Sequence, residues 1–164
     1  MKRDQLIFVG VLLAGAVIAA IIVLATGGDD ESASTSTSTD TKPTVEVPEG
    51  EPPKELEIED ITEGEGAEAQ PGDTVSVQYV GVNYSDGSEF DASWDRGEPF
   101  EFQLGAGGVI PGWDEGVVGM KEGGRRQLVI PPELGYGRQG QPPDIPPNET
   151  LVFVIDLLEV RSGQ

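Results

Sequence analysis

Short stretches in which apolar and polar residues alternate fill the C-terminal part of the chain, and they constrain its fold more than any other feature. Residues 75–79 read Val-Ser-Val-Gln-Tyr, and residues 100–104 read Phe-Glu-Phe-Gln-Leu. A period of two places every second side chain on the same face of a β-strand. Residues 151–160 are apolar at most positions, which is typical of a central strand covered on both faces. The sequence therefore predicts a sheet, to which residues 56–61 and 128–130 also contribute.

One segment has helical spacing instead. The apolar residues Trp113, Val117 and Met120 follow one another at intervals of four and three, which places them on one face of a helix. This helix is expected to follow Pro111 and Gly112 and to end at Gly123 and Gly124, because glycine readily adopts the backbone conformation that terminates a helix. Several antiparallel strands with one short helix covering a face form an α+β fold.

The N-terminus contains a candidate membrane segment. Two basic residues precede an almost uninterrupted apolar run at residues 6–25. Its length matches the roughly 20 residues that cross a bilayer as a helix, and it exceeds the apolar core of a signal peptide. The basic residues would keep residues 1–5 in the cytoplasm. We expect a single-pass transmembrane anchor with the rest of the chain outside the cytoplasm; the alternative is cleavage after Ala25, which would secrete the protein.

The segment after the apolar run is polar. Residues 26–53 are rich in Ser, Thr, Pro and acidic residues. Because such a segment has too little apolar surface to offset the entropy lost on ordering, it is predicted to be a disordered linker. Residues 54–164 are predicted to be the folded domain, since about 110 residues suffice for one hydrophobic core.

Composition excludes several classes of function. The chain has 30 acidic and 10 basic residues and a formal net charge of -20, which argues against nucleic-acid binding. It has no His and no Cys, so disulfides, thiolate zinc sites and Cys or His catalysis are excluded. The acidic residues near position 90 lack the order of an EF-hand calcium loop, and the glycine-rich residues 105–112 lack the Lys and Ser/Thr of a P-loop. No metal or cofactor is therefore expected.

The candidate functional residues are mostly aromatic. Asp91 directly follows Phe90, and Arg96 lies five positions further on. A carboxylate against an apolar wall needs a partner, which a guanidinium or a phenol can supply. Tyr136 lies between glycines, where its hydroxyl could point at a ligand carbonyl or cap the loop. The exposed backbone before Trp113 could hydrogen-bond an extended peptide.

Several short motifs together resemble the FK506-binding-protein (FKBP) family of peptidyl-prolyl isomerases, in the order that the family has them. The resemblance covers residues 56–160. Its motifs are Val77–Ser93 with Phe-Asp-Ala-Ser at its end, Pro99–Phe102, Val109–Gly116, Leu134–Gly137, Ile145–Phe153 and Ile155–Leu158. The resemblance implies an antiparallel half-barrel sheet wrapped around one short α-helix, with the active pocket between them. It also implies peptidyl-prolyl cis-trans isomerase activity.

The resemblance further implies roles for individual residues. Trp113 would lie beneath the prolyl ring, Tyr136 would donate to a substrate carbonyl, and the Ile110 amide would hold the peptide backbone. The family pattern is broken at Gln141, where His is common, and at Asp144, which replaces an apolar residue; these changes affect the loop that influences substrate preference. The implied catalytic residues are Phe90, Asp91, Tyr136 and Phe153. The implied substrate-binding residues are Tyr79, Arg96, Phe100, Val109, Ile110, Trp113 and Ile145.

The same resemblance implies the partners. Proline-containing polypeptides would be the substrates, macrolides of the FK506 or rapamycin type would be possible inhibitors, and a monomer without a cofactor is expected. The alternative on the same fold is a peptide-binding or holdase domain that keeps the pocket without catalysing rotation. A structural adhesion domain, which would bind no macrolide, is a third interpretation.

Overall fold

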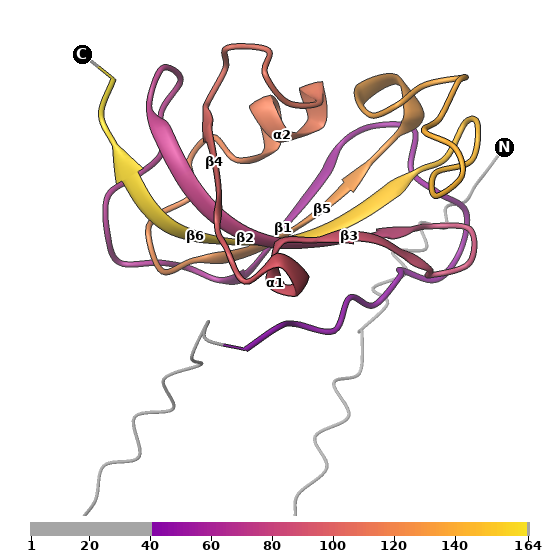
Figure 1. Cartoon of the computed structure of the whole chain (residues 1–164), viewed down its shortest axis with the longest axis horizontal. Coiled ribbons are helices and arrows are strands. Elements are labelled where there is room, and N and C mark those ends of the chain that lie inside the picture. The colour runs from indigo at the N-terminus through magenta and orange to yellow at the C-terminus, as the bar shows by residue number, and fades with distance from the viewer. Residues whose placement is uncertain (1–40, 164) are drawn as a thin grey trace, which may run out of the picture. The chain divides into compact units, whose positions relative to one another are not determined.

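The computed structural model describes residues 41–163. Within them, six antiparallel strands form one sheet with the order β1-β5-β6-β2-β3, and β4 also pairs with β2. The predicted antiparallel sheet is therefore present, and Figure 1 shows it curving around the helix α2. The strands are β1 (Glu57–Thr62), β2 (Thr74–Asn83), β3 (Glu89–Ala92), β4 (Phe100–Gln103), β5 (Arg125–Ile130) and β6 (Leu151–Arg161).

The connections between the strands contain three short helices, whereas the sequence predicts one helix. The predicted helix is α2, and the other two are single turns within connections. The helices are α1 (Ser93–Arg96), α2 (Pro111–Gly116) and the 3-10 turn η1 (Pro132–Leu134).

The helix α2 is shorter than its sequence pattern predicts, because it ends at Gly116 rather than near Gly123. Gly119 has a φ of 85°, in the left-handed region, so the helix does not continue through it. Its N–H donates to the carbonyl of Ala69 at 2.9 Å, and the Ala69 N–H donates to the carbonyl of Met120 at 2.7 Å. Bonds to a neighbouring loop therefore replace the last helical turns. The helical spacing still identifies buried residues, since Met120 is almost completely inaccessible.

The core lies between α2 and the concave face of the sheet. The central strand β6 is buried on both faces from Leu151 to Leu157, as the sequence predicts, and becomes exposed at Leu158. In β4, Phe102 is buried whereas Phe100, on the same face, is 37% exposed. This difference matters for function, because the exposed surface of Phe100 faces a pocket.

Residues 41–53, which the sequence assigns to a disordered linker, instead pack against the outer face of the sheet. Val45 and Val47 lie against a second apolar cluster formed by strand residues such as Val80 and Val152. Figure 1 shows this segment on the side of the sheet opposite α2. Val45 and Val47 therefore contribute to the packing of the domain from within the predicted linker, because they have apolar partners on the sheet.

The predicted cytoplasmic residues 1–5, the predicted membrane span at 6–25 and the first part of the predicted linker lie outside the described residues. Between residues 41 and 163, no helix has the length and apolar character that crossing a bilayer requires.

Candidate active site

A pocket of about 280 Å³ opens between α2 and the concave face of the sheet. Side chains from four strands, from α2 and from two loops meet there, although they are distant in sequence. We call this the aromatic pocket. It is lined by Tyr79, Phe90, Asp91, Phe100, Gly108, Val109, Ile110, Trp113, Tyr136 and Phe153.

Four aromatic rings fix the shape of the aromatic pocket. The Trp113 ring, at the centre of α2, is 4.9 Å from the Tyr79 ring and 5.2 Å from the Phe153 ring, both in edge-to-face geometry. Phe90 packs on Phe153 in the same way at 5.4 Å. Edge-to-face pairs place the positive edge of one ring against the negative face of the other, which stabilises this arrangement. The rings support one another and leave an apolar recess above Trp113.

One polar triad borders the recess. The Tyr79 hydroxyl donates to Asp91 Oδ2 at 2.5 Å, and Arg96 Nη1 donates to Asp91 Oδ1 at 2.5 Å. Arg96 Nη2 also donates to the Tyr79 oxygen at 2.8 Å. Burial, reinforced by the hydrogen bond to Asp91, raises the pKa of Tyr79 to about 12. The phenol therefore stays protonated at neutral pH, and the Asp91 charge is balanced by Arg96.

Two of the hydrogen-bond donors at the edge of the aromatic pocket, both without a partner within residues 41–163, could serve a ligand. The Tyr136 hydroxyl has no hydrogen-bond partner within residues 41–163, and its pKa is raised by burial and by the Asp91 charge. The backbone N–H of Ile110, at the start of α2, likewise donates to no group in this part of the chain. A ligand with two carbonyl oxygens could accept from both.

The loop before α2 is held by Asp114, to which the sequence analysis assigned no role in the site. Asp114 accepts hydrogen bonds from the backbone N–H of Gly105 at 2.9 Å and of Gly107 at 3.0 Å. These bonds fix the loop that carries Val109 and Ile110 into the aromatic pocket. An acidic residue in the first turn of a short helix is a signal for such a role, because its carboxylate can bind nearby N–H groups.

Gly81 is a second residue that sequence reasoning missed. A Cβ atom at this position would lie 2.6 Å from the rings of both Phe90 and Phe153. Only glycine therefore lets these two rings lie directly over β2. A glycine inside a strand is a general signal of such a close approach.

Of the eleven residues predicted for the site, nine line the aromatic pocket, whereas Arg96 and Ile145 do not. Arg96 acts through its bonds to Tyr79 and Asp91. Ile145 is 2% exposed and lines an adjoining cavity of about 270 Å³, which we call the side cavity. The structure thus brings all eleven together, and the substrate-binding and catalytic roles remain predictions.

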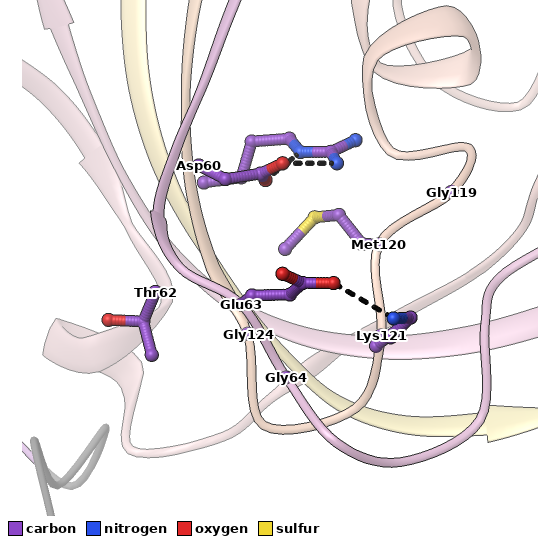
Figure 2. Close-up of a pocket in the computed structure, with 9 residues that line it drawn as sticks. Asp60, Thr62, Glu63, Gly64, Gly119, Met120, Lys121 and Gly124 are labelled. Carbon is purple, nitrogen blue, oxygen red and sulfur yellow. Dashed lines mark hydrogen bonds and ion pairs between the residues drawn. The ribbon is translucent and has the colours of Figure 1, made fainter.

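Another hollow, shown in Figure 2, measures only about 40 Å³. It has room for a few water molecules at most. Its charged groups already pair, with Arg126 Nε 2.5 Å from Asp60 Oδ1 and Lys121 Nζ 2.8 Å from Glu63 Oε1. Arg126 also donates to the carbonyl of Gly116 at 2.8 Å. Arg126 therefore joins the end of α2 to strand β5 of the sheet. The candidate active site is the aromatic pocket.

Comparison with known proteins agrees with this geometry. A family model described as "FKBP-type peptidyl-prolyl cis-trans isomerase" matches residues 65–158. An "FK506-binding protein" of Streptomyces anulatus is 62% identical over 120 residues, which are 73% of this chain and 97% of the relative. A "Probable FK506-binding protein" of Corynebacterium glutamicum is 55% identical over 117 residues, 71% of this chain and 97% of the relative.

Two solved structures share the fold. FkpA from Escherichia coli superposes with a TM-score of 0.60 at 50% identity, over 66% of this chain and 49% of FkpA. AtFKBP13 superposes with a TM-score of 0.60 at 39% identity, over 63% of this chain and 91% of that protein. The chain therefore belongs to the family of FKBP-type peptidyl-prolyl cis-trans isomerases. The predicted family and isomerase activity are confirmed.

Proposed function

We propose that the aromatic pocket is the site at which this enzyme accelerates rotation about the peptide bond preceding proline. The observation that carries the proposal is the apolar recess of about 280 Å³ above Trp113, with the free donors of Tyr136 and Ile110 at its edge. A prolyl ring is apolar and compact, and it would lie against Trp113, beside the packed rings of Phe90 and Phe153. The peptide carbonyls on either side would accept from the two donors.

The chemistry needs no nucleophile. The barrier to rotation, roughly 18–20 kcal/mol, is the resonance energy of the planar amide. In the twisted transition state the C–N bond loses double-bond character, and the amide becomes less dipolar. Surroundings that are apolar and shaped for a rotated carbonyl therefore bind the transition state more tightly than the planar ground state, which lowers the barrier. Tyr136 would orient the rotated carbonyl, and Asp91 would hold Tyr79 in place against Trp113.

A protease-coupled proline-isomerisation assay on the full chain tests this assignment. Tyr136→Phe removes only the hydroxyl, so it is expected to lower kcat/KM by roughly 2- to 10-fold, the equivalent of one hydrogen bond. Trp113→Ala is expected to abolish most of the activity. Full activity in a folded Trp113→Ala variant would overturn the proposed site.

The alternative of a non-catalytic holdase predicts a different result. Such a domain would suppress the aggregation of an unfolded client while leaving the rate of isomerisation unchanged. The aromatic pocket itself favours catalysis, because its donors are unpaired within residues 41–163 and available to a substrate. Measuring aggregation and turnover on the same preparation separates the two functions.

The aromatic pocket is also proposed to bind macrolides of the FK506 type. Support comes from two relatives, the FK506-binding protein of Streptomyces anulatus and the probable FK506-binding protein of Corynebacterium glutamicum. FK506 is expected to inhibit isomerisation competitively and to change the fluorescence of Trp113. Inhibition that increasing peptide substrate does not relieve would place the macrolide elsewhere.

For the location of the enzyme, we propose a single-pass anchor at residues 6–25, with the monomeric isomerase domain outside the cytoplasm. The support is the length of the apolar run and the basic residues Lys2 and Arg3 before it. Cell fractionation and sequencing of the mature N-terminus test this proposal. A soluble protein beginning after Ala25 would instead favour secretion.

A further inference from the structure

The side cavity lies directly beside the aromatic pocket. Phe90, Asp91 and Tyr136 line both spaces. A peptide whose proline occupies the aromatic pocket therefore places a neighbouring side chain at the opening of the side cavity. The remaining lining residues of the side cavity are Gln141, Pro142, Asp144 and Ile145.

The backbone that carries Asp144 into the side cavity is firmly held. Gln141 and Ile145 exchange two backbone hydrogen bonds of 2.9 Å each, which closes the turn that contains Asp144. Asn83 Nδ2, from β2, donates to the carbonyl of Asp144 at 2.8 Å. The backbone position of Asp144 is therefore set by the fold, and its exposed carboxylate takes no part in holding the turn.

The Asp144 carboxylate is the unbalanced charge of the side cavity. It forms no hydrogen bond or ion pair with any group of residues 41–163. The second carboxylate, Asp91, is already paired with Arg96 at 2.5 Å. Arg138, the one basic residue of residues 131–150, is not among the lining residues. A ligand cation that enters the side cavity would therefore meet one unpaired carboxylate, and no Lys or Arg side chain is among the lining residues.

The charge of the whole chain acts in the same direction. Its formal charge of -20 attracts cationic peptides and repels acidic ones before contact. Tyr136 and Phe90 supply apolar surface for the stem of a long side chain, and such stems pack on apolar surface while the charged end stays polar. Lysine and arginine have this combination of stem and cation.

We propose that the side cavity is a subsite for a lysine or arginine adjacent to the substrate proline, and that Asp144 determines this preference. The inference rests on the proposed function of the aromatic pocket. Within the isomerase reaction, Asp144 is a specificity-determining residue: it binds the flanking side chain and takes no part in rotation of the amide.

The test compares matched tetrapeptides with the full-length enzyme. Lys, Leu or Glu is placed before the proline in one series and after it in another, and kcat/KM is measured for each. Lys peptides are expected to exceed Leu peptides by roughly two- to fivefold in one of the series, the effect of a partly exposed ion pair. Raising the salt to about 1 M, where the Debye length is about 3 Å, should remove most of this preference.

Variants assign the preference to one carboxylate. Asp144→Asn is expected to bring the ratio of Lys to Leu close to one, and Asp144→Lys is expected to favour Glu peptides over Lys peptides. Glu55→Gln is the matched control. Glu55 is exposed and lines neither space, and its substitution removes the same charge as Asp144→Asn. It should keep the wild-type ratio.

The outcomes distinguish the inference from the proposed function. Equal or higher kcat/KM for Leu peptides in both series, or a Lys preference that survives in both Asp144 variants, would overturn the subsite while leaving the isomerase site intact. A change of the ratio in Glu55→Gln equal to that in Asp144→Asn would attribute the preference to overall charge and overturn it as well. No acceleration with any peptide would overturn the proposed function, and the subsite with it.

Discussion

Gly81 controls how closely the rings of the aromatic pocket approach β2. Because an added Cβ atom would lie 2.6 Å from the Phe90 and Phe153 rings, Gly81→Ala must displace both. Overpacking of this kind is expected to lower the free energy of unfolding by about 1–3 kcal/mol and to reduce kcat/KM. Urea denaturation and the isomerisation assay measure the two effects. Gly108→Ala is the stability control, since nothing lies within 4 Å of its Cβ position; equal losses in both variants would contradict this explanation.

The raised pKa of Tyr79 predicts that the protein loses stability in strong alkali. The phenol has an ordinary pKa of 10.0 when unfolded, and burial together with the bond to Asp91 raises it to about 12 in the folded protein. As the pH rises from 10 to 12, the unfolded chain loses this proton first, so unfolding becomes more favourable. Stability attributable to Tyr79 should therefore be constant below pH 10 and fall above it. In Tyr79→Phe this part of the decline should be smaller, which denaturation at a series of pH values measures.

At the residue scale, the sequence predicts which residues belong to the pocket better than it predicts the contacts between them. The aromatic residues of the pocket could be identified because their alternation and motif order are visible in the chain. The role of Gly81 could not, because it depends on the strand register that sets Gly81 opposite Phe153 and Asp91. The binding of Gly105 and Gly107 by Asp114 likewise depends on the path of a loop that no periodicity describes.

At the scale of elements, the N-terminal segment 41–53 is expected to stabilise the domain, so versions with and without it should differ in their free energy of unfolding. Val45 and Val47 are half-buried against the outer face of the sheet, and Lys42 Nζ lies 3.0 Å from Glu89 and 2.8 Å from Asp95. Beginning the chain at residue 54 instead of residue 41 is expected to lower the free energy of unfolding by about 1–3 kcal/mol, mainly through lost apolar burial. Urea denaturation of the two versions measures this.

A paired substitution separates apolar burial from chain length. Val45→Ser with Val47→Ser in the longer version should reproduce most of the loss. Glu46→Gln, at the exposed position between them, should not. Identical midpoints for the long and short versions would show that the segment contributes nothing to stability.

The same segment explains why its order could not be predicted. Composition measures whether a stretch can bury apolar surface by itself, and residues 26–53 as a whole cannot. The two valines become buried only because the sheet presents an apolar outer face. The similarity to the Streptomyces anulatus protein extends over 120 of the 164 residues and so begins at about residue 45 or earlier. Part of this segment therefore belongs to the region that the relative shares.

For the whole molecule, net charge predicts how stability depends on salt. With 30 acidic and 10 basic residues, repulsive pairs of charges outnumber attractive ones. This repulsion is stronger in the compact state than in the unfolded chain, so it lowers stability at low ionic strength. Raising the salt from about 0.01 M to about 0.15 M shortens the Debye length from about 30 Å to about 8 Å. The urea midpoint of the full chain should therefore rise with sodium chloride.

Whether the urea midpoint rises or falls with salt distinguishes two explanations. Net repulsion predicts a rise, whereas stabilisation by local ion pairs predicts a fall. Pairs such as Arg96–Asp91 and Lys121–Glu63 are weakened by added salt. If they dominated, the urea midpoint would fall as salt is added. Such exposed pairs contribute at most about 1 kcal/mol each, whereas the excess of negative charge is distributed over the entire chain. A midpoint that falls between the two salt concentrations would therefore contradict the view that net repulsion, rather than specific pairing, governs the electrostatics of this enzyme.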